Sequence, residues 1–278
     1  MKPEQFLASH WVFTRKELEL VPQERGSRSR GTVSSHLTRW RRQGRILKVK
    51  EGLYVRTEPT KGSGVQALDL LPLASKMAPD AALAYHTALE AHGLAQSLFE
   101  RIAFVTWTKT KPLRFQGRDF VPVRPREALK RSGKADGWIE SMERSGVELR
   151  VTSLERTVVD VFDRPDLAGG TEEVWRSCMG VPALDLREVE AYLKVLARRA
   201  LVARVGFFLE QRVEELAVPR SLLDRLRNRI PRSTAYFDRR IRGRLASGWN
   251  LIVPERWMTA PEGQEPDILR PPPAHPPV

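Results

Sequence analysis

Apolar and polar positions repeat with a helical period over residues 32–43. Val33, Leu37 and Trp40 are spaced i, i+4 and i+7, so they fall on one side of a helix. Gly44 follows at the position where many helices end in a left-handed residue. This pattern predicts an amphipathic helix that buries one stripe and exposes the opposite one.

Two further patterns flank this helix. Thr14 and Glu17 have the spacing of a capping box, which predicts a short helix capped by Thr14, and residues 24–31 are rich in Gly, Ser and Arg and predict a turn. Downstream, two β-rich runs at 46–50 and 53–56 are separated by a glycine turn and predict a hairpin. Helix, turn, helix and two-stranded wing is the order of a winged helix-turn-helix domain, which we expect over residues 1–57.

From residue 65 onward the pattern is mixed α/β. A helix is expected to begin at a Ser153 cap and to run to residue 163. The other expected helices are 65–77, 81–92, 171–179, 186–198 and 201–215, and the expected strands are 102–107, a hairpin within 113–123, and 147–151.

The predicted fold class is therefore α/β (α+β), an N-terminal winged helix-turn-helix followed by a larger mixed α/β C-terminal domain. Residues 58–64 combine Pro, Gly, Ser and Thr, which is typical of a linker. The C-terminal domain is expected over 65–257. The remaining residues, 258–278, are rich in proline and are expected to be a disordered tail.

Composition narrows the class of protein. The 278 residues are 41% apolar and 29% charged, which excludes wholesale disorder. The single cysteine, Cys178, excludes an internal disulfide and a Cys-rich zinc site. The N-terminus has no apolar segment of the kind found in signal peptides, and no run approaches the length of a membrane span. We therefore expect a cytoplasmic protein with no membrane segment.

Positive charge is segregated along the chain. The net charge is +13, with +8 in residues 1–57, zero in 58–217, +7 in 218–257 and −2 in the tail. Two basic segments flanking a neutral body favour a polyanionic partner, of which nucleic acid is the commonest. The alternative, that both segments are only solvated faces, stays open.

The helix over 32–43 carries the expected DNA-reading surface. Small hydroxyl side chains and arginines lie opposite its apolar stripe and suit the major groove of an inverted-repeat operator in double-stranded DNA. Neighbouring cations are expected to contact phosphates. The candidate DNA-binding residues are Arg28, Arg30, Thr32, Ser34, Ser35, Thr38, Arg39, Arg41, Arg42, Lys48 and Lys50. The alternative is a winged helix that is used only for protein contacts.

The second basic segment interleaves arginines with aromatic residues. This pattern suits phosphates and stacked bases, including those of RNA, and the alternative is a C-terminal helix with a solvated arginine face. The candidate residues are Arg225, Arg227, Arg229, Arg239, Arg240, Arg242 and Arg244, with Tyr236, Phe237 and Trp249 among them.

Catalytic and metal patterns are weak. Ser153-x-Glu155-Arg156-Thr157-x-x-Asp160 is more typical of helix capping and an Arg156–Asp160 ion pair than of a carboxylate dyad. His86 and His92 are six residues apart and do not share a helix face. No lysine is preceded two positions earlier by an acid, which argues against one large nuclease class. We expect no enzyme activity, metal or cofactor; an enzyme acting on nucleic acid is the less favoured alternative.

Four stretches resemble the AbiEi family of antitoxins from type IV toxin–antitoxin systems. They are the wing at 45–54, Tyr85 to Leu94, Val151 to Asp160, and Ala203 to Glu210 together with the basic segment that ends at Trp257. The resemblance implies a winged-helix repressor of its own operon that counteracts a nucleotidyltransferase-like toxin without forming a stable complex, in phage defence. In this family the winged helix is associated with operator binding and the C-terminal domain with antitoxin activity. The alternative is a stand-alone winged-helix regulator without a toxin partner.

Overall fold

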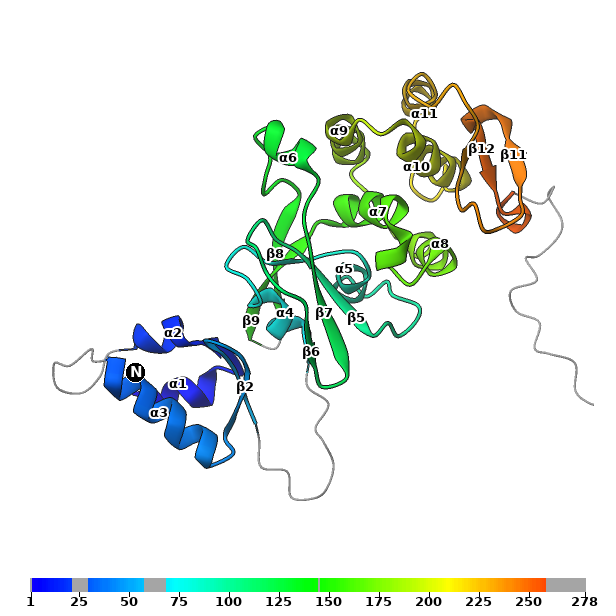
Figure 1. Cartoon of the computed structure of the whole chain (residues 1–278). Coiled ribbons are helices and arrows are strands. Elements are labelled where there is room, and N and C mark those ends of the chain that lie inside the picture. The colour runs from blue at the N-terminus through cyan, green and yellow to red at the C-terminus, as the bar shows by residue number, and fades with distance from the viewer. Residues whose placement is uncertain (1, 22–29, 58–68, 145, 259–278) are drawn as a thin grey trace, which may run out of the picture. The chain divides into compact units, whose positions relative to one another are not determined.

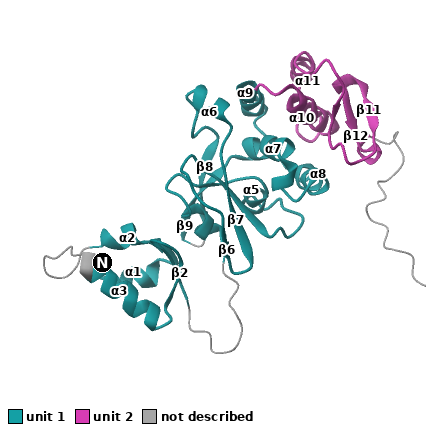
Figure 2. Ribbon diagram, viewed as in Figure 1, with its two compact units in different colours: residues 1–196 teal, residues 197–278 magenta. Residues whose placement is uncertain are grey.

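The computed structural model describes residues 2–21, 30–57, 69–144 and 146–258 (Figure 1). The chain divides into two compact units, residues 1–196 and 197–278 (Figure 2). The division falls inside the range 65–257, which we expected to be one domain. The α+β class is confirmed. The expected linker 58–64, and the tail beyond Met258, lie outside the described residues.

The N-terminal part has the element order of a winged helix-turn-helix domain. Its three strands form an antiparallel sheet of order β1-β3-β2. The elements are α1 (Pro3–Ser9), β1 (Val12–Thr14), α2 (Arg15–Glu19), α3 (Arg30–Arg42), β2 (Ile46–Lys50) and β3 (Leu53–Arg56). The fold class predicted for this part is confirmed, whereas α1 and β1 lie ahead of the elements that the sequence pattern predicts.

Local signals of the winged helix act as predicted. The Thr14 side chain accepts from the Glu17 amide at 3.2 Å, and the Thr14 amide donates to the Glu17 carboxylate at 2.6 Å. Gly44 ends α3 with φ +65°, and Gly52 turns the hairpin with φ +75°, a region that favours glycine. The core of this domain contains Phe13, whose ring meets that of Trp40 edge to face at 6.5 Å.

The body of the first unit is built on a six-stranded mixed sheet of order β6-β7-β5-β4-β9-β8. Within it, β5 runs parallel to β7 and β4 runs parallel to β9, while the other neighbours are antiparallel. The strands are β4 (Ala82–Leu83), β5 (Arg101–Val105), β6 (Leu113–Phe115), β7 (Arg118–Val123), β8 (Ile139–Arg144) and β9 (Val147–Thr152).

Helices of the body match the sequence pattern only in part. They are α4 (Leu71–Ser75), α5 (His86–Ala91), α6 (Glu127–Arg131), α7 (Leu154–Asp163), α8 (Thr171–Met179) and α9 (Leu186–Leu196). The helix expected over 81–92 is wrong in its first half, because residues 82–83 pair as a central strand and Tyr85 has φ +57°. The helix expected over 65–77 covers only α4 within the described residues.

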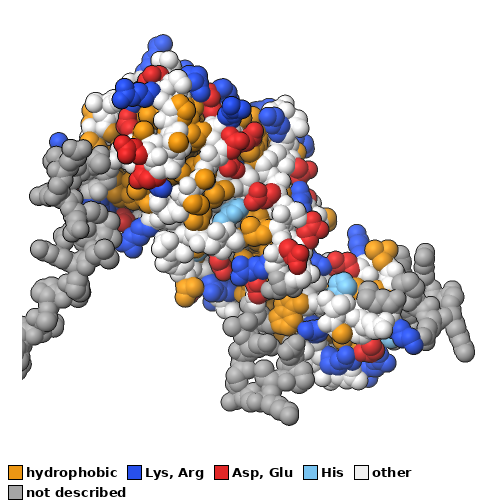
Figure 3. Space-filling model, turned by 180° about the vertical axis from the view of Figure 1, so that it is seen from behind, with side chains coloured by type: hydrophobic (Ala, Val, Ile, Leu, Met, Phe, Trp, Pro, Cys, Tyr) orange, Lys and Arg blue, Asp and Glu red, His pale blue; other side chains and the backbone are white. Residues whose placement is uncertain are grey.

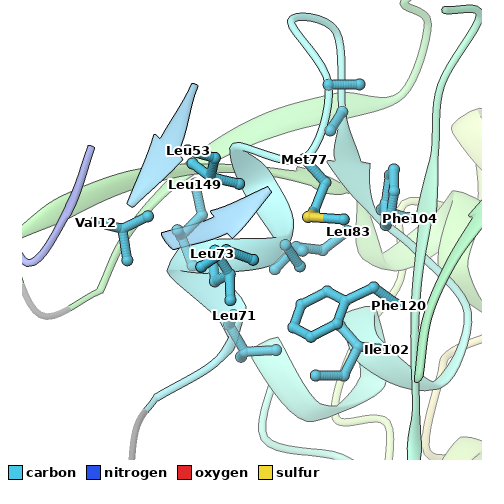
Figure 4. Close-up of a cluster of buried hydrophobic side chains, with 14 of the residues drawn as sticks. Val12, Leu53, Leu71, Leu73, Met77, Leu83, Ile102, Phe104, Phe120 and Leu149 are labelled. Carbon is cyan, nitrogen blue, oxygen red and sulfur yellow. The ribbon is translucent and has the colours of Figure 1, made fainter. Parts of the chain in front are cut away.

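The winged helix shares a hydrophobic core with the body. Val12 and Leu53 from its sheet lie in one buried cluster with Leu71, Leu73 and Leu149 (Figure 4). Each of these side chains is at most 2% exposed. The sheet β1-β3-β2 therefore has one face in the core of the winged helix and its other face buried against the body. The winged helix is thus packed on the body rather than joined to it only by a linker.

The second unit combines two helices with a small sheet. Its elements are α10 (Arg199–Gln211), α11 (Arg220–Arg227), β10 (Ala235–Tyr236), β11 (Arg244–Ala246) and β12 (Leu251–Val253), with the sheet order β10-β12-β11. Trp249 is fully buried in it, and its Nε1 donates to Glu210 at 2.7 Å. Short 3-10 helices lie at Pro165–Leu167, Ser247–Trp249 and Glu255–Trp257. Of the helices in the described part of the chain, none is long and apolar enough to cross a membrane.

Candidate nucleic-acid interface

Helix α3 has a buried side and an open side. Val33, Leu37 and Trp40 are 4%, 4% and 0% exposed, so the predicted stripe anchors the helix in the core. On the opposite side, α3 and the residue after it line a shallow, open depression of about 420 Å³. That depression is lined by Ser34, Ser35, Thr38, Arg39, Arg42 and Gln43. Seen from behind, Lys and Arg side chains gather along the lower edge of the winged helix (Figure 3).

A carboxylate from α1 holds part of this surface. Glu4 accepts from Arg39 at 2.7 Å, from Arg45 at 2.8 Å and from the Trp40 indole at 3.0 Å. Burial alone raises the pKa of Glu4, but the hydrogen bonds from Trp40 and Arg45 and the two arginine charges bring it below its ordinary value. Glu4 is thus ionised at neutral pH and holds the Arg39 side chain by an ion pair. The sequence pattern did not single out Glu4, because it lies 35 residues from its partner.

His36 supports the same arginine. Its Nδ1 lies 3.2 Å from Arg39 Nη2, and its ring lies 5.5 Å from that of Trp40. Burial, followed by the Arg39 charge, lowers the pKa of His36. A neutral imidazole can accept the hydrogen bond from Arg39, whereas a protonated one cannot.

The other predicted residues of α3 differ in their availability. Ser34 accepts from Arg15 at 3.1 Å, and Thr32 is half-buried. Ser35 and Thr38 are exposed. Arg41 and Arg42 are also exposed, and neither has an ion pair within 4.0 Å among the described residues. Arg28, and the side chain of Arg30, lie outside the described residues.

The wing presents fewer free cations than the sequence predicts. Lys48 is exposed and pairs with Glu51. Lys50 instead donates to the carbonyl of Met77 in the body, and burial lowers its pKa. The prediction that Lys50 contacts phosphate is therefore not supported by its position, because the wing sheet packs against the body at this point.

The basic segment of the second unit divides into two groups. Arg227 bonds to Glu210 and packs on the Trp249 ring at 5.1 Å, Arg229 is half-buried, and Arg240 bonds to Asp238. Arg227 and Arg229 thus belong to the packed part of the unit, whereas the Arg240 side chain is 80% exposed and makes this local pair. Of the seven candidate residues, the exposed ones are Arg225, Arg239, Arg240, Arg242 and Arg244. Of the interleaved aromatics, Phe237 and Trp249 are buried and Tyr236 is 39% exposed, so the predicted platform of stacked bases is reduced to Tyr236 with Arg239 at 5.8 Å.

The Ser153–Asp160 motif is structural, as predicted. Ser153 caps α7 by accepting from the Arg156 amide at 3.3 Å. Arg156 is 1% exposed and pairs with Asp160 at 3.2 Å, and the Tyr192 hydroxyl donates to the same carboxylate at 2.7 Å. Every polar group of the cluster is occupied within the protein, so the motif fastens α7 to α9.

His86 and His92, the two histidines of the stretch Tyr85 to Leu94, make different contacts. His92 Nε2 lies 2.9 Å from the carbonyl of Thr152. His86 is buried 3.5 Å from Glu173, and burial lowers the pKa of His86. Within the ranges that the structure describes, no three His, Cys, Asp or Glu side chains cluster as metal ligands.

The structure defines the class as an α+β protein with an N-terminal winged helix-turn-helix domain. No model of a known protein family matches the chain, and no curated protein matches it. The fold is similar to the crystal structure of the RV2827C protein from Mycobacterium tuberculosis, with a TM-score of 0.55 and 17% identity over 90% of this chain and 89% of the other. A likeness at this identity concerns the fold alone.

Proposed function

We propose that this protein binds duplex DNA through the outer face of α3 and regulates transcription. The observation that carries the proposal is the division of α3 into two sides. Its apolar stripe is locked into the core, while its hydroxyl and arginine side chains line an open surface. A rigid helix with short polar side chains and arginines is suited to approach base edges in the major groove.

The electrostatics of the winged helix favour the same partner. Residues 1–57 carry a net charge of +8. Arg41 and Arg42 are exposed at the end of α3, where they can reach phosphates without first leaving an acidic partner in the described part of the chain. Such contacts raise both the affinity for DNA and its dependence on salt.

The resemblance to AbiEi antitoxins extends this proposal. We infer a cytoplasmic antitoxin of a type IV system, which represses its own operon and opposes a nucleotidyltransferase-like toxin without a stable complex. No enzymatic activity of its own is part of this role. We assign a further nucleic-acid contact, with RNA as the proposed ligand, to four exposed arginines of the second unit: Arg225, Arg239, Arg242 and Arg244.

DNA binding is tested with the duplex upstream of the gene, by fluorescence anisotropy on the full chain. Arg42→Ala is expected to cost about 1–3 kcal/mol if Arg42 reads a base, with altered sequence preference. If Arg42 contacts phosphate, the loss is uniform across sequences and the salt slope falls by about 0.9. Arg187→Ala, on the exposed side of α9, is the matched control. Wild-type affinity for Arg42→Ala and for Thr38→Ala would refute the assignment to α3.

The antitoxin role is tested in cells. The neighbouring gene and this gene are expressed from separate promoters, and growth is measured. Toxicity of the neighbour that this chain relieves is the expected result. A harmless neighbour removes the antitoxin role and leaves the stand-alone regulator, which the DNA-binding experiment tests separately.

A further inference from the structure

A third basic region lies in the body, which is neutral when counted as a whole. Residues 107–134 contain nine Lys and Arg and two Asp and Glu, a net charge of +7. The acids that balance this count lie outside residues 107–134 in the sequence, but two of them contact the region in space: Asp80 accepts from the Trp107 amide at 2.7 Å, and Asp163 accepts from Arg126 at 2.9 Å. The net charge of the whole range 58–217 is therefore zero although residues 107–134 are strongly basic.

Sheet topology brings the cations of this region together. Strands β5 and β7 are parallel neighbours, so their carboxyl ends lie at the same edge of the sheet. The segment after β5 contains Trp107 at its second position, and the segment after β7 begins with Arg124 and continues into α6. Arg124 and Lys130 approach the Trp107 ring at 5.5 and 5.8 Å. Two segments that are separate in the sequence thus form one surface.

Most cations of this surface are not neutralised by the protein. The two acids are already occupied, since Glu127 pairs with Arg124 at 2.9 Å and Asp119 lies 3.7 Å from Arg114. Arg118 and Arg126 are turned to other partners, the carbonyl of Phe99 and the carboxylate of Asp163. Five exposed cations remain without an ion pair among the described residues: Lys109, Lys111, Lys130, Arg131 and Lys134. We call these five residues, with Trp107 and Arg124, the sheet-edge surface.

Tryptophan rings are interleaved with these cations. Trp107 is half-buried, and its indole N–H donates to the carbonyl of Ala135 at 3.3 Å. Trp138 lies beyond it, with Lys134 4.8 Å from its ring centre, and its N–H donates to Glu188 at 2.7 Å. The Trp138 ring also packs on that of Tyr192, with ring centres 4.8 Å apart, so Trp107 is the ring assigned to this surface. Because its N–H is satisfied within the protein, its exposed part offers apolar surface beside the cations.

We propose that the sheet-edge surface binds a single-stranded nucleic acid by its phosphate backbone. Cations beside aromatic rings are the pattern by which proteins hold single strands without reading sequence. A duplex is less well matched, because the surface consists of loops and of α6, a helix of five residues, and contains no helix long enough to enter a groove. This proposal is independent of the assignment of α3 to duplex DNA.

The test uses fluorescein-labelled oligouridylate and oligothymidylate, with anisotropy measured over a salt series. The parent protein is the full chain in which the four second-unit arginines assigned above to RNA are replaced by Ala, so that the two proposed contacts are tested separately. The variant combines Lys109→Ala, Lys111→Ala and Lys130→Ala. Its matched control removes the same charge elsewhere, with Arg101→Ala at the amino end of β5, Arg176→Ala on α8 and Arg199→Ala at the start of α10. All six side chains lie at positions where alanine leaves the core unchanged.

The variant is expected to bind single strands about tenfold more weakly at low salt and to lose about 2 from the salt slope, which is about 0.7 for each phosphate contact removed. The control keeps the binding of the parent protein, and excess duplex DNA does not displace the single strand. Preference for one oligomer over the other distinguishes RNA from single-stranded DNA as the ligand. The proposal would be overturned if the parent protein and the variant bound the oligomers equally, or if the control lost as much affinity as the variant. It would also be overturned if polyglutamate bound as tightly as the oligomers.

Discussion

Replacement of Glu4 by Gln tests whether α1 restrains the DNA-reading surface. Glu4 is the shared acceptor of Arg39 and Arg45, and it is the carboxylate that lies on the open side of α3. The amide of Gln keeps an acceptor oxygen for the Trp40 indole but loses the negative charge. The substitution therefore releases the two arginines with little disturbance of the packing around Trp40.

The expected change in DNA affinity follows from the exposure of the Glu4–Arg39 ion pair. The Glu4 and Arg39 side chains are 49% and 50% exposed, so their pair belongs to the surface class, which contributes about 0.2–1 kcal/mol. Arg39 must leave Glu4 before it can contact DNA, and the carboxylate also repels phosphate. Removal of its charge is expected to tighten duplex binding by about 0.5–1.5 kcal/mol, which corresponds to about 2- to 10-fold in Kd. The free energy of unfolding is expected to fall by less than about 1 kcal/mol.

Anisotropy with duplex DNA at low salt measures this change, and Glu19→Gln is the control. Glu19 is also a half-exposed winged-helix carboxylate and pairs with Arg15 at 2.9 Å, but it does not contact the arginines of α3. Glu4→Gln should tighten binding, and the gain should vanish when Arg39 is replaced by Ala. Equal tightening in both Glu variants would indicate a general charge effect, and no tightening in Glu4→Gln would refute the restraint.

Three further predictions concern stability, each measured by urea denaturation with circular dichroism. Gly206→Ala should destabilise by about 1–3 kcal/mol despite the higher helix propensity of Ala, because a Cβ there would lie 2.1 Å from the buried Trp249 ring; a neutral result would show that the ring has room to move. Asp160→Asn should cost about 3–5 kcal/mol, because it leaves the charge of Arg156 buried without its counter-ion; a loss below about 1 kcal/mol would contradict that role. Glu17→Gln should cost about 1 kcal/mol at neutral pH, because Gln can still accept from the Thr14 amide in the capping box but loses the ion pair with Lys76. Burial raises the pKa of Glu17, but the hydrogen bonds to its carboxylate outweigh burial and lower this pKa below 4.5. The stabilisation by the Glu17 charge is therefore complete above pH 4.5 and is lost as the pH falls further, so the stability difference between wild type and Glu17→Gln should shrink. A stability difference that stays constant with pH would contradict this account.

Elements that depend on neighbours in sequence were predictable. The apolar stripe of α3, the Thr14 capping box and the glycine turn of the wing involve residues within a few positions of each other, and periodicity and capping chemistry report such contacts directly. The hairpin of β6 and β7 follows the same rule. By contrast, residues 81–92 have a helical pattern but contain β4, because pairing with β5 and β9 in the centre of the sheet outweighs local preference.

The candidate site was predictable only as a set of residue types. The sequence indicated which side of α3 carries hydroxyls and arginines, but it did not indicate that Arg39 is held by Glu4 or that Lys50 is turned to Met77. It likewise did not separate Arg227, which supports Trp249, from the exposed arginines of the same segment.

The sequence by itself thus determined the winged helix, the amphipathic pattern of α3 and the overall excess of positive charge. Tertiary structure alone decided which cations are available, since an ion pair forms between side chains that the fold brings within reach, however far apart they lie in the chain. It also created the sheet-edge surface, because parallel pairing of β5 and β7 places the segments after both strands at one edge. Periodicity records the environment of a residue along its own helix or strand and carries no information about such distant partners.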